Sequence, residues 1–328
     1  MAVKASGSPL SFSEIETEFG QNSDRDLGEY RVSQTVGGLS NQPLDASIPQ
    51  SGAIKFSDFY SKRLNVVVDC HSGGRQDRII AKNDKWNNNA VTVIGGFRSK
   101  KEGGSKIIIN VNKKFCSNKD ATTRCALRTG SWDGSSIVQV DLGSSARVLG
   151  SGGDGGRGAN GIDNSGQAGF TGTSGLGIEV NNCTVNVASG AIIRAGFGGG
   201  GGGGGGRQVD KGQDRRASGG GGGGGAGCPP GAGGPRGTTG SLGSDGSAGS
   251  ETTGGTGGGR GVNENQAYGG RGGDGGDANG AADNGANAEN SGGQGGASGA
   301  AIRRTSGFSV SINNSGTIVG STSATGTS

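Results

Sequence analysis

Few side chains in this chain have the types and spacing that catalysis or metal binding requires. His71 is the only histidine among 328 residues, so a Ser or Cys nucleophile would have a single imidazole base available. Cys70 precedes it directly, and neighbouring side chains on an extended chain point in opposite directions. A zinc site would need further ligands at motif spacing, and the sequence also contains no nucleophile elbow near His71 and no Walker-type phosphate loop. The sequence therefore predicts no enzyme, no catalytic residue, no metal site and no cofactor.

Two short glycine motifs match ligand-binding patterns only in part. Gly272–Asp277 reads GGDGGD, the start of a calcium-binding nonapeptide repeat, but the unit occurs once and asparagine occupies its aliphatic position. Arg271–Gly273 is a single RGG unit, whereas RNA-binding segments repeat this unit and interleave aromatic residues. Between Phe197 and Phe308 the only aromatic residue is Tyr268. Calcium binding and RNA binding are therefore minor alternatives.

The polar segments that interrupt the glycine are the main candidates for ligand contact. Arg207–Arg216 lies between Gly198–Gly206 and Gly219–Gly225, the two longest glycine runs. As extended helices these runs would be about 28 and 22 Å long, and the segment between them would form the tip of a hairpin. Val262–Tyr268 and Asp277–Asn290 have a similar composition, and solvated turns without a ligand are the alternative for all three. The candidate side chains are Arg207, Gln208, Asp210, Lys211, Asp214, Arg215, Arg216, Asn263, Asn265 and Tyr268.

Glycine dominates the second half of the chain. Residues 196–299 contain 46 glycines in 104 positions. Because glycine loses the most backbone entropy on folding, a disordered linker is one interpretation. Polar or Pro-bearing pieces interrupt the tract, however, and a β pattern returns at Gly307–Ile312. These features favour an ordered bundle of polyproline-II-type helices, in which glycine lets neighbouring backbones hydrogen-bond, although the strict Gly-X-Y period of collagen is absent. In such a bundle we expect packing positions to recur near every third residue of the runs.

The composition limits any conventional core. Hydrophobic residues make up 29% and aromatic residues 4% of the chain, whereas roughly 45–50% apolar residues, glycine included, is usual. The net charge of +4 is modest and the signs are mixed, unlike the basic face of a nucleic-acid binder. No signal-peptide pattern and no long apolar run occurs, so we expect a soluble chain made without a signal peptide. The five cysteines are expected to be mostly reduced, with a Cys116–Cys125 pair in an oxidising exterior as the alternative.

The first 63 residues contain a repeated pattern. Gly7–Ile15 (GSPLSFSEI) returns at Gly52–Phe59 (GAIKFSDF). Each copy is typical of an extended piece followed by a capped helical turn, with Ser13 and Glu16 as a capping box and Asp58 in the first turn of the second helix. Because so small a unit buries little apolar surface, we expect it to dock onto a larger assembly. The docking candidates are Phe12, Ile15, Phe19, Phe56, Phe59 and Tyr60.

Residues 64–149 have the ordinary pattern of β-structure, with strands separated by Gly and Asn turns. We expect them to form a small sandwich or barrel-like module. The expected strands are Leu64–Cys70, Ala90–Ile94, Lys106–Val111 and Ile137–Leu142. A strand–turn–strand arch also occurs three times, at Val140–Val148, Val185–Ile193 and Phe308–Val319. Because stacked repeats bury a core jointly, and because the first and last arch bracket the glycine tract, the arches predict one continuous domain.

The N-terminal repeat resembles a module of virion structural proteins from marine tailed phages, especially cyanophages. Those proteins open with a stretch like LSFSEIETEFG and continue to a segment like IPxSGAIKFSDFY; the matching residues here are Leu10–Gly20 and Ile48–Tyr60. The remainder is similar in composition to the glycine-rich distal domains of phage tail-fibre adhesins. In those domains polyglycine-II helices pack as a sandwich, and variable loops at its tip contact the host surface. The two resemblances imply a virion tail or fibre component that is attached by its N-terminus and presents its C-terminal domain outward.

The resemblance and the residue patterns together predict a mostly β protein with a polyglycine-II helix bundle. We divide it into a virion-attachment module (1–63), a small β domain (64–136) and a domain of β-arches and glycine-rich segments (137–328). The predicted function is a tail fibre or adhesin, assembled in the host cytoplasm and located in the virion tail. It would be oligomeric there, bind other tail or baseplate proteins through residues 1–63, and contact a host-surface glycan or protein, without nucleic-acid binding or membrane insertion. The alternatives are a baseplate or decoration protein without receptor binding, and a glycine-rich RNA-binding or ice-binding protein.

Overall fold

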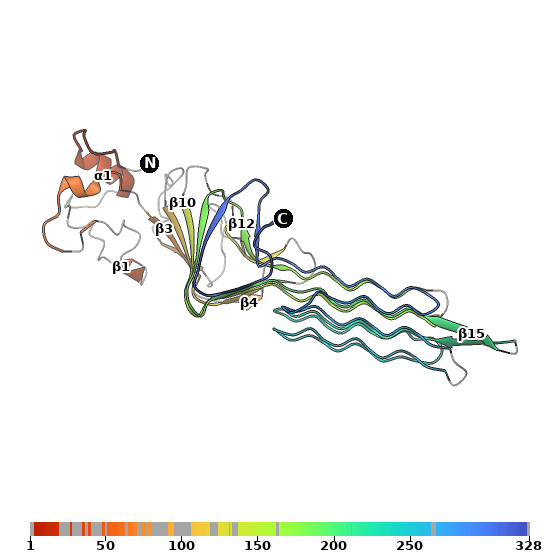
Figure 1. Cartoon of the computed structure of the whole chain (residues 1–328). Coiled ribbons are helices and arrows are strands. Elements are labelled where there is room, and N and C mark those ends of the chain that lie inside the picture. Colours follow the sequence, from red (N-terminus) through yellow and green to blue (C-terminus); the bar gives the residue numbers. More distant parts are fainter. Residues whose placement is uncertain are drawn as a thin grey trace.

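The computed structural model shows an N-terminal module, a β-structured body and a long projection of extended segments (Figure 1). No helix in the described part of the chain is long and apolar enough to cross a membrane. The residues whose structure is described are 3–19, 27, 35–36, 39–40, 48–49, 51–62, 65–70, 74–75, 78–79, 91–94, 106–118, 124–130, 132, 137–161, 164–210, 212–263 and 267–326.

The body is a parallel β-helix. Each rung supplies one strand to each of three sheets, whose strand orders are β18-β13-β10-β7-β3, β19-β14-β11-β8-β4 and β20-β17-β12-β9-β5. β6 (Val91–Ile94) adds to the first sheet by pairing antiparallel to β3. The rungs are, in order, β3 (Asn65–Cys70), β4 (Gly74–Arg75) and β5 (Arg78–Ile79); β7 (Lys106–Val111), β8 (Lys114–Cys116) and β9 (Cys125–Arg128); β10 (Ile137–Leu142), β11 (Arg147–Leu149) and β12 (Ser174–Ile178); β13 (Cys183–Val187), β14 (Ile192–Arg194) and β17 (Ile302–Arg304); and β18 (Val310–Asn314), β19 (Thr317–Val319) and β20 (Ala324–Thr325).

The rungs are in register, so apolar residues stack directly on one another. Val140 of β10 pairs with Ile109 of the rung before it and with Val185 of the rung after it, and Val185 pairs in turn with Ile312. Alternate residues of β10 and β13 are buried, as expected of strands with one face toward a core. The largest fully buried side chains of this core are Phe115, Ile107, Ile109, Leu127, Leu142, Leu176, Ile178 and Ile193.

The stacking confirms the predicted arches and corrects the predicted module. The three arches lie on consecutive rungs and pair in parallel, as expected. The predicted strands at Lys106–Val111 and Ile137–Leu142 are β7 and β10. The expectation of a sandwich or barrel is wrong, because these strands pair in parallel and belong to a β-helix. The expected boundary between residues 136 and 137 falls between two rungs of that one body, since β10 continues the sheet of β7.

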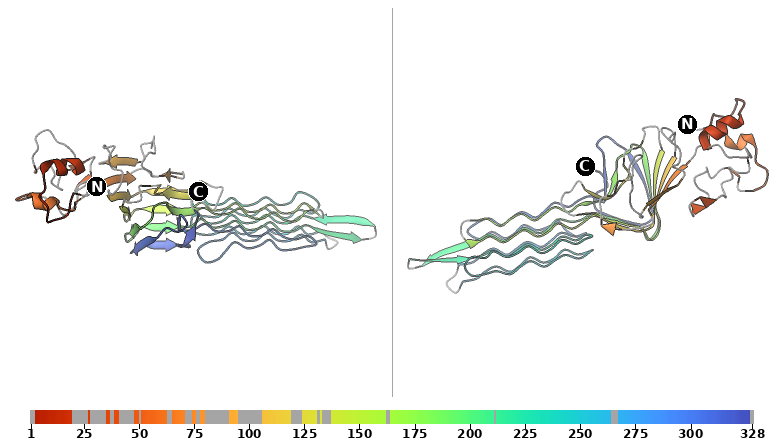
Figure 2. Two further views of the ribbon diagram at one scale, coloured as in Figure 1. Left: turned by 90° about the horizontal axis from the view of Figure 1, so that it is seen from above. Right: turned by 180° about the vertical axis from the view of Figure 1, so that it is seen from behind.

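Two connections leave the β-helix and form the projection, called the glycine array below. Residues 150–173 connect β11 to β12, and residues 195–301 connect β14 to β17. Their extended segments run side by side away from the β-helix (Figures 1 and 2). The end of the array at the β-helix is called proximal and the other end distal. The segments are 150–159, 166–173, 195–205, 218–227, 231–237, 241–250, 253–262, 268–277, 281–287 and 290–301.

Backbone hydrogen bonds join these segments with a period of three residues. Three successive amides, from Gly199 to Gly201, donate to three different segments, and the next three amides repeat the same order. The two segments with the longest glycine runs are bonded on all sides. Segment 195–205 is bonded to 150–159, 166–173, 218–227, 268–277, 281–287 and 290–301. Segment 218–227 is bonded to 150–159, 195–205, 231–237, 241–250, 253–262 and 268–277. A three-residue repeat of this kind requires glycine wherever two backbones touch.

Peripheral segments have fewer neighbours, and their side chains take over part of the hydrogen bonding. Asp154 Oδ1 accepts from the amide of Ala232 at 2.6 Å, and Asp274 Oδ1 accepts from that of Gly257 at 2.7 Å. Asn and Ser residues act in the same way, as Asn284 does toward Gly295 at 2.8 Å. These polar residues therefore satisfy backbone donors that would otherwise face water.

The N-terminal module contains α1 (Phe12–Phe19), the 3-10 helix η2 (Phe56–Phe59) and a pair of two-residue strands, β1 (Thr35–Val36) and β2 (Leu39–Ser40). The backbone and hydroxyl of Ser11 donate to Glu14 at 2.7 and 2.9 Å, so Ser11 and Glu14 cap the start of α1. The side chain of Glu16, the second member of the predicted capping box, lies outside the described part. Asp58 lies in the first turn of η2 as predicted and accepts from the amide of Lys55 at 2.7 Å.

Two of the predicted docking residues are buried inside this module. Ile15 and Phe59 form a small core with Val3 and Ile48, so they face no free surface and the prediction is wrong for them. Phe56 is exposed. Phe12 is half-buried and packs edge-on against Phe56 with ring centroids 5.6 Å apart. Tyr60 is also half-buried and donates its hydroxyl to the carbonyl of Ser8 at 2.7 Å, and the side chain of Phe19 lies outside the described part.

The cysteine pairing also differs from the sequence expectation. Cys116 forms a disulfide with Cys228, 112 residues away, and Cys125, Cys70 and Cys183 are buried and form no disulfide. A Cys116–Cys125 pair is therefore wrong. Burial raises the pKa of the Cys183 thiol to about 12.

Candidate functional site at the distal end of the glycine array

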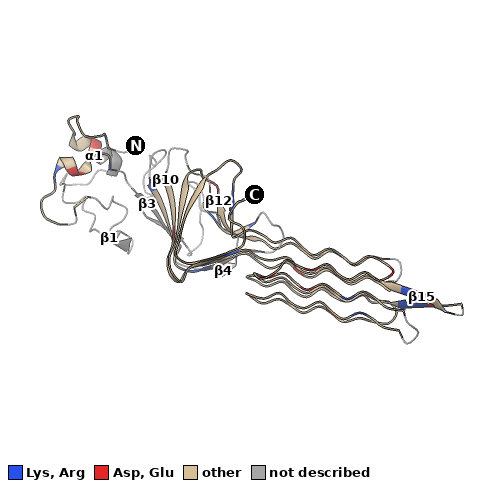
Figure 3. Ribbon diagram, in the orientation of Figure 1, with Lys and Arg blue, Asp and Glu red and all other residues tan. Residues whose placement is uncertain are grey.

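The distal end of the array carries a β-hairpin that projects beyond the other segments (Figures 1 and 3). Its strands, β15 (Gly206–Asp210) and β16 (Gln213–Ala217), continue the two segments that are bonded on all sides. Gly212 at the turn has φ +74°, a conformation that favours glycine. Because the hairpin extends the two central segments, its base is held by the best-supported part of the array.

Arginine side chains surround one carboxylate on this hairpin. Arg207 Nε donates to Asp214 Oδ1 at 2.9 Å, and Arg216 donates two hydrogen bonds to Oδ2 at 3.2 and 3.0 Å. Hydrogen bonding from Arg216, then from Arg207, lowers the pKa of Asp214. Arg215 donates to Gln213 at 2.9 Å. One carboxylate between two guanidinium groups leaves the described hairpin side chains with a net positive charge (Figure 3).

A second distal turn packs beside the hairpin. Asn160 Oδ1 accepts from the amide of Thr238 at 2.7 Å, and Arg157 NH2 lies 3.4 Å from the same oxygen. The side chain of Arg216 reaches this turn, since a Cβ at Gly161 would lie 3.4 Å from Arg216 Cδ. Residues more than 75 positions apart in the sequence therefore share one polar surface.

A third distal turn combines a cation, an aromatic ring and exposed apolar groups. Val262 and Tyr268 form an antiparallel bridge, and the guanidinium of Arg260 lies 4.7 Å from the centre of the Tyr268 ring. Tyr268 lies against the base of the hairpin, because a Cβ on Gly206 would meet its carbonyl. Among the described residues, four of the seven exposed large hydrophobic side chains lie at this end: Val209, Leu242, Val262 and Tyr268. Exposed apolar groups within a polar surface are typical of a recognition site.

The structure brings most of the predicted ligand-contact residues together. Arg207, Gln208, Asp214, Arg215 and Arg216 lie on the hairpin, and Asn263 and Tyr268 lie on the adjacent turn. Asp210 belongs to β15, although its side chain lies outside the described part, as do Lys211 and Asn265 entirely.

Other residues of this end were not predicted. Arg157, Asn160, Thr238, Leu242 and Arg260 join it from segments whose polar residues looked like ordinary turns. The sequence feature that could have identified them is their position, since each lies near the end of a glycine-rich segment. The grouping of Asp277 with the other candidates is wrong, because its bridge to Gly280 closes a turn at the proximal end.

Within the described ranges, no three His, Cys, Asp or Glu side chains gather closely enough to hold a metal ion. In the motif that resembles a calcium-binding repeat, Asp274 Oδ1 accepts hydrogen bonds from the amide of Gly257 and from NH2 of Arg271, the latter at 3.2 Å. His71 lies outside the described residues.

Comparison with known proteins gives one family and one solved structure. Residues 78–323 match the family of phage tail fibre adhesin Gp38. The crystal structure of the gp37-gp38 adhesin tip complex of the bacteriophage S16 long tail fiber is similar over 98% of this chain and 99% of that chain, with 18% sequence identity and a TM-score of 0.36. No curated protein matches the sequence. The family match covers the β-helix from β5 to β19 and the whole glycine array.

Proposed function

The chain belongs to the phage tail fibre adhesin Gp38 family, and we propose that the distal end of its glycine array binds the host-cell surface. As a member of this family it is a structural protein of the virion tail. The observation that carries the proposal is the gathering, at one end, of the hairpin and of turns from distant parts of the sequence. Such turns can present a varied surface while a rigid scaffold holds them in place.

The scaffold itself is, in this proposal, a bundle of polyglycine-II helices. The three-residue hydrogen-bond period and the six neighbours of each central segment support it, because a three-fold helix without internal hydrogen bonds directs its backbone groups outward in just this way. Nearly every backbone hydrogen bond in the array joins two different segments rather than two residues of one segment. Its stiffness therefore comes from cross-links between segments, which keeps the distal end in one orientation.

The N-terminal module is proposed to attach the chain to another tail-fibre protein. It lies at the opposite end of the molecule from the hairpin (Figure 1), and it exposes Phe56, which packs against the half-buried Phe12. The similar solved structure is a complex of gp37 with gp38, which is consistent with a partner of this kind. Deletion of residues 1–63 should leave a chain that no longer incorporates into phage particles, and normal incorporation would contradict this assignment.

The host-binding proposal is tested with the purified full chain and cells that the parent phage infects. We expect a variant with Arg207→Ala, Arg215→Ala and Arg216→Ala to bind at least about tenfold more weakly, because Arg residues at the centre of an interface commonly contribute this much. The matched control is Thr252→Ala with Asn279→Ala, which changes exposed residues of proximal turns.

Each outcome of this experiment decides between the candidates. Weaker binding by the distal variant alone supports the adhesin. Equal loss in the distal and proximal variants would place the contact elsewhere on the array. If the unmodified chain does not bind host cells at all, the protein is a decoration of the tail without receptor binding.

A further inference from the structure

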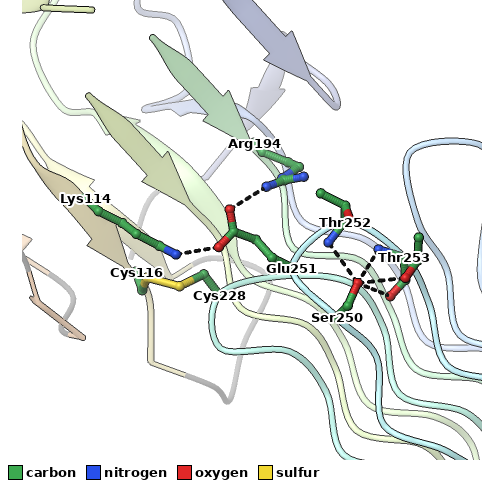
Figure 4. Close-up of polar contacts among 8 residues, drawn as sticks. All are labelled: Lys114, Cys116, Arg194, Cys228, Ser250, Glu251, Thr252 and Thr253. Atoms are coloured by element: carbon green, nitrogen blue, oxygen red, sulfur yellow. Dashed lines mark hydrogen bonds and ion pairs between the residues drawn. A yellow bond between two sulfur atoms is a disulfide. The ribbon is translucent and has the colours of Figure 1, made fainter. Parts of the chain in front are cut away.

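The proximal end of the array is tied to the β-helix by side chains of two strands of one sheet, β8 and β14 (Figure 4). Cys116 of β8 forms its disulfide with Cys228, which stands at the first proximal turn of the long connection; the two Cα atoms are 5.2 Å apart. Cys228 is also fixed by its backbone, since its amide donates to the carbonyl of Gly150 at 2.7 Å. This turn is therefore joined to β8 by a covalent cross-link and to the start of segment 150–159 by a backbone hydrogen bond.

The second proximal turn is held by charge. Glu251 accepts from Lys114, which also belongs to β8, and from Arg194 NH2 of β14 at 3.1 Å (Figure 4). Burial alone would raise the pKa of Glu251, but the hydrogen bond and charge of Lys114 and the charge of Arg194 together lower it. The amide of Gly227 donates to the carbonyl of Ser250 at 3.1 Å, so the two turns also hold each other. Strand β8 thus holds both turns, through Cys116 and Lys114, and Arg194 of β14 adds a second contact to Glu251.

The array does not depend on the disulfide for its own pairing. The hydrogen bonds that join its segments run through every level of the array. At the disulfide itself, the amide of Gly152 donates to the carbonyl of Pro229 at 2.9 Å. A chain with two thiols in place of the disulfide would therefore keep the same segments paired, and the cross-link would act only on the movement of the turn against β8.

We propose that Cys116 and Cys228 are an oxidative lock, open as two thiols in the reducing cytoplasm where the chain is made and closed once the protein reaches an oxidising exterior. Cytosolic thiols stay reduced, whereas exported or released proteins can oxidise. In the closing step, the thiolate of one cysteine attacks a low-molecular-weight disulfide and releases one small thiol. The second thiolate then attacks the mixed disulfide and releases the other small thiol. Two protein thiols are thereby oxidised, one small disulfide is reduced to two thiols, and the lock is closed.

The other cysteines are unsuited to this reaction. Cys70, Cys125 and Cys183 are fully buried in the β-helix, and thiolate formation at Cys183 is further suppressed by burial. Cys228, by contrast, is partly exposed. Oxidation is therefore selective for one pair, and this selectivity is measurable.

The test uses the full chain, purified from a reducing cytoplasm with excess thiol and then treated with glutathione disulfide. The number of alkylated cysteines in the denatured protein, measured by mass spectrometry, should fall from five to three, with one peptide pair joining Cys116 to Cys228. In the same samples, hydrogen exchange in a peptide covering residues 225–235 should slow at least tenfold on oxidation. A peptide covering the distal turn at 237–243 serves as the internal control and should not change.

Variants separate the lock from a general effect of oxidation. Cys116→Ala should show the fast exchange under both conditions, and Cys125→Ala should behave like the unmodified chain. Five alkylated cysteines after oxidation, or oxidation that leaves exchange at residues 225–235 unchanged, would overturn the proposal. The unmodified chain in its two redox states provides this answer even if a variant fails to fold. None of these measurements depends on host binding, so failure of the adhesin proposal would leave them unaffected.

Discussion

Valine in place of Gly202 tests whether the array is close-packed. A Cβ at Gly202 would lie 2.0 Å from the carbonyl oxygen of Arg157 and 2.4 Å from its carbon. These are backbone atoms of a neighbouring segment, which cannot yield without breaking its own hydrogen bonds. The matched control is Gly259→Val on a peripheral segment, where only the hydroxyl of Ser244 lies within 4 Å, at 3.4 Å.

The expected cost follows from the hydrogen bonds at Gly202. Its amide donates to the carbonyl of Gln167 at 2.9 Å, and its carbonyl accepts from Gly293 at 2.7 Å. Separating the segments leaves these buried groups unpaired, at about 1–3 kcal/mol each, so the free energy of unfolding should fall by about 2–6 kcal/mol. Gly259→Val should change it by no more than about 0.5 kcal/mol, as at other surface positions.

Thermal denaturation of the full chain, followed by circular dichroism, measures this difference. At about 2–4 °C per kcal/mol, the midpoint for Gly202→Val should fall by roughly 4 °C or more, whereas that for Gly259→Val should stay near the unmodified value. Equal midpoints for the two variants would refute the packing argument. The expectation that harmful positions recur near every third residue of the runs is wrong, because a Cβ at any glycine from Gly198 to Gly206 would meet backbone within 3 Å; the three-residue pattern belongs to the peripheral segments.

Three further results are expected. Glu14→Gln should speed limited proteolysis of the N-terminal module at neutral pH, because Lys4 and Ser11 lower the pKa of Glu14 to about 2; this support is complete above the ordinary pKa of 4.5 and is lost as pH falls toward 2. Cleavage at the rate of the unmodified chain would argue against the Ser11–Glu14 cap. Host attachment should be unchanged between pH 7 and pH 5, because the lowered pKa of Asp214 keeps its arginine pairs intact until pH falls below the usual Asp value; a loss within that range would count against this clamp. Cys116→Ala should lower the free energy of unfolding of the oxidised chain by about 5 kcal/mol, the chain-entropy value for a loop of roughly 100 residues. A decrease no larger than that of Cys125→Ala would show that the disulfide adds little.

The strand pattern could be predicted from the sequence, but the way the strands pair could not. β10 and β13 alternate buried and less buried residues along their whole length, which is a clear period-two signal. The third strand of each rung has no such signal; β12, for example, reads SGLGI and is buried at all five positions. Without the third strand of each rung the arches resemble parts of a sandwich, because alternating burial is typical of antiparallel sheets with one face in water.

The candidate site was predictable only where composition changed sharply. The Arg-rich hairpin stands between two uninterrupted glycine runs, so its place at a tip followed from the sequence. Arg157 and Thr238 meet Asn160 only because of how the segments are ordered in space, and no spacing in the sequence gives that order. The same holds for Cys116 and Cys228, since the spacing of five scattered cysteines does not determine which two become neighbours.

The glycine pattern of each segment corresponds to the number of neighbours around it. The runs without interruption belong to the two segments that have six neighbours. Segment 268–277 has four, and it carries side chains at every third position, with pairs of glycine between them. Segment 241–250 has three neighbours, and there only every third residue, such as Gly243 and Gly246, must be glycine. A side chain is allowed wherever a face of the segment has no neighbouring segment. Packing therefore restricts the sequence of the segments strictly, but it places little restriction on the sequence of the distal turns. Substitutions and insertions in those turns should therefore leave the scaffold folded, and an adhesin of this design can change the surface it recognises without changing its fold.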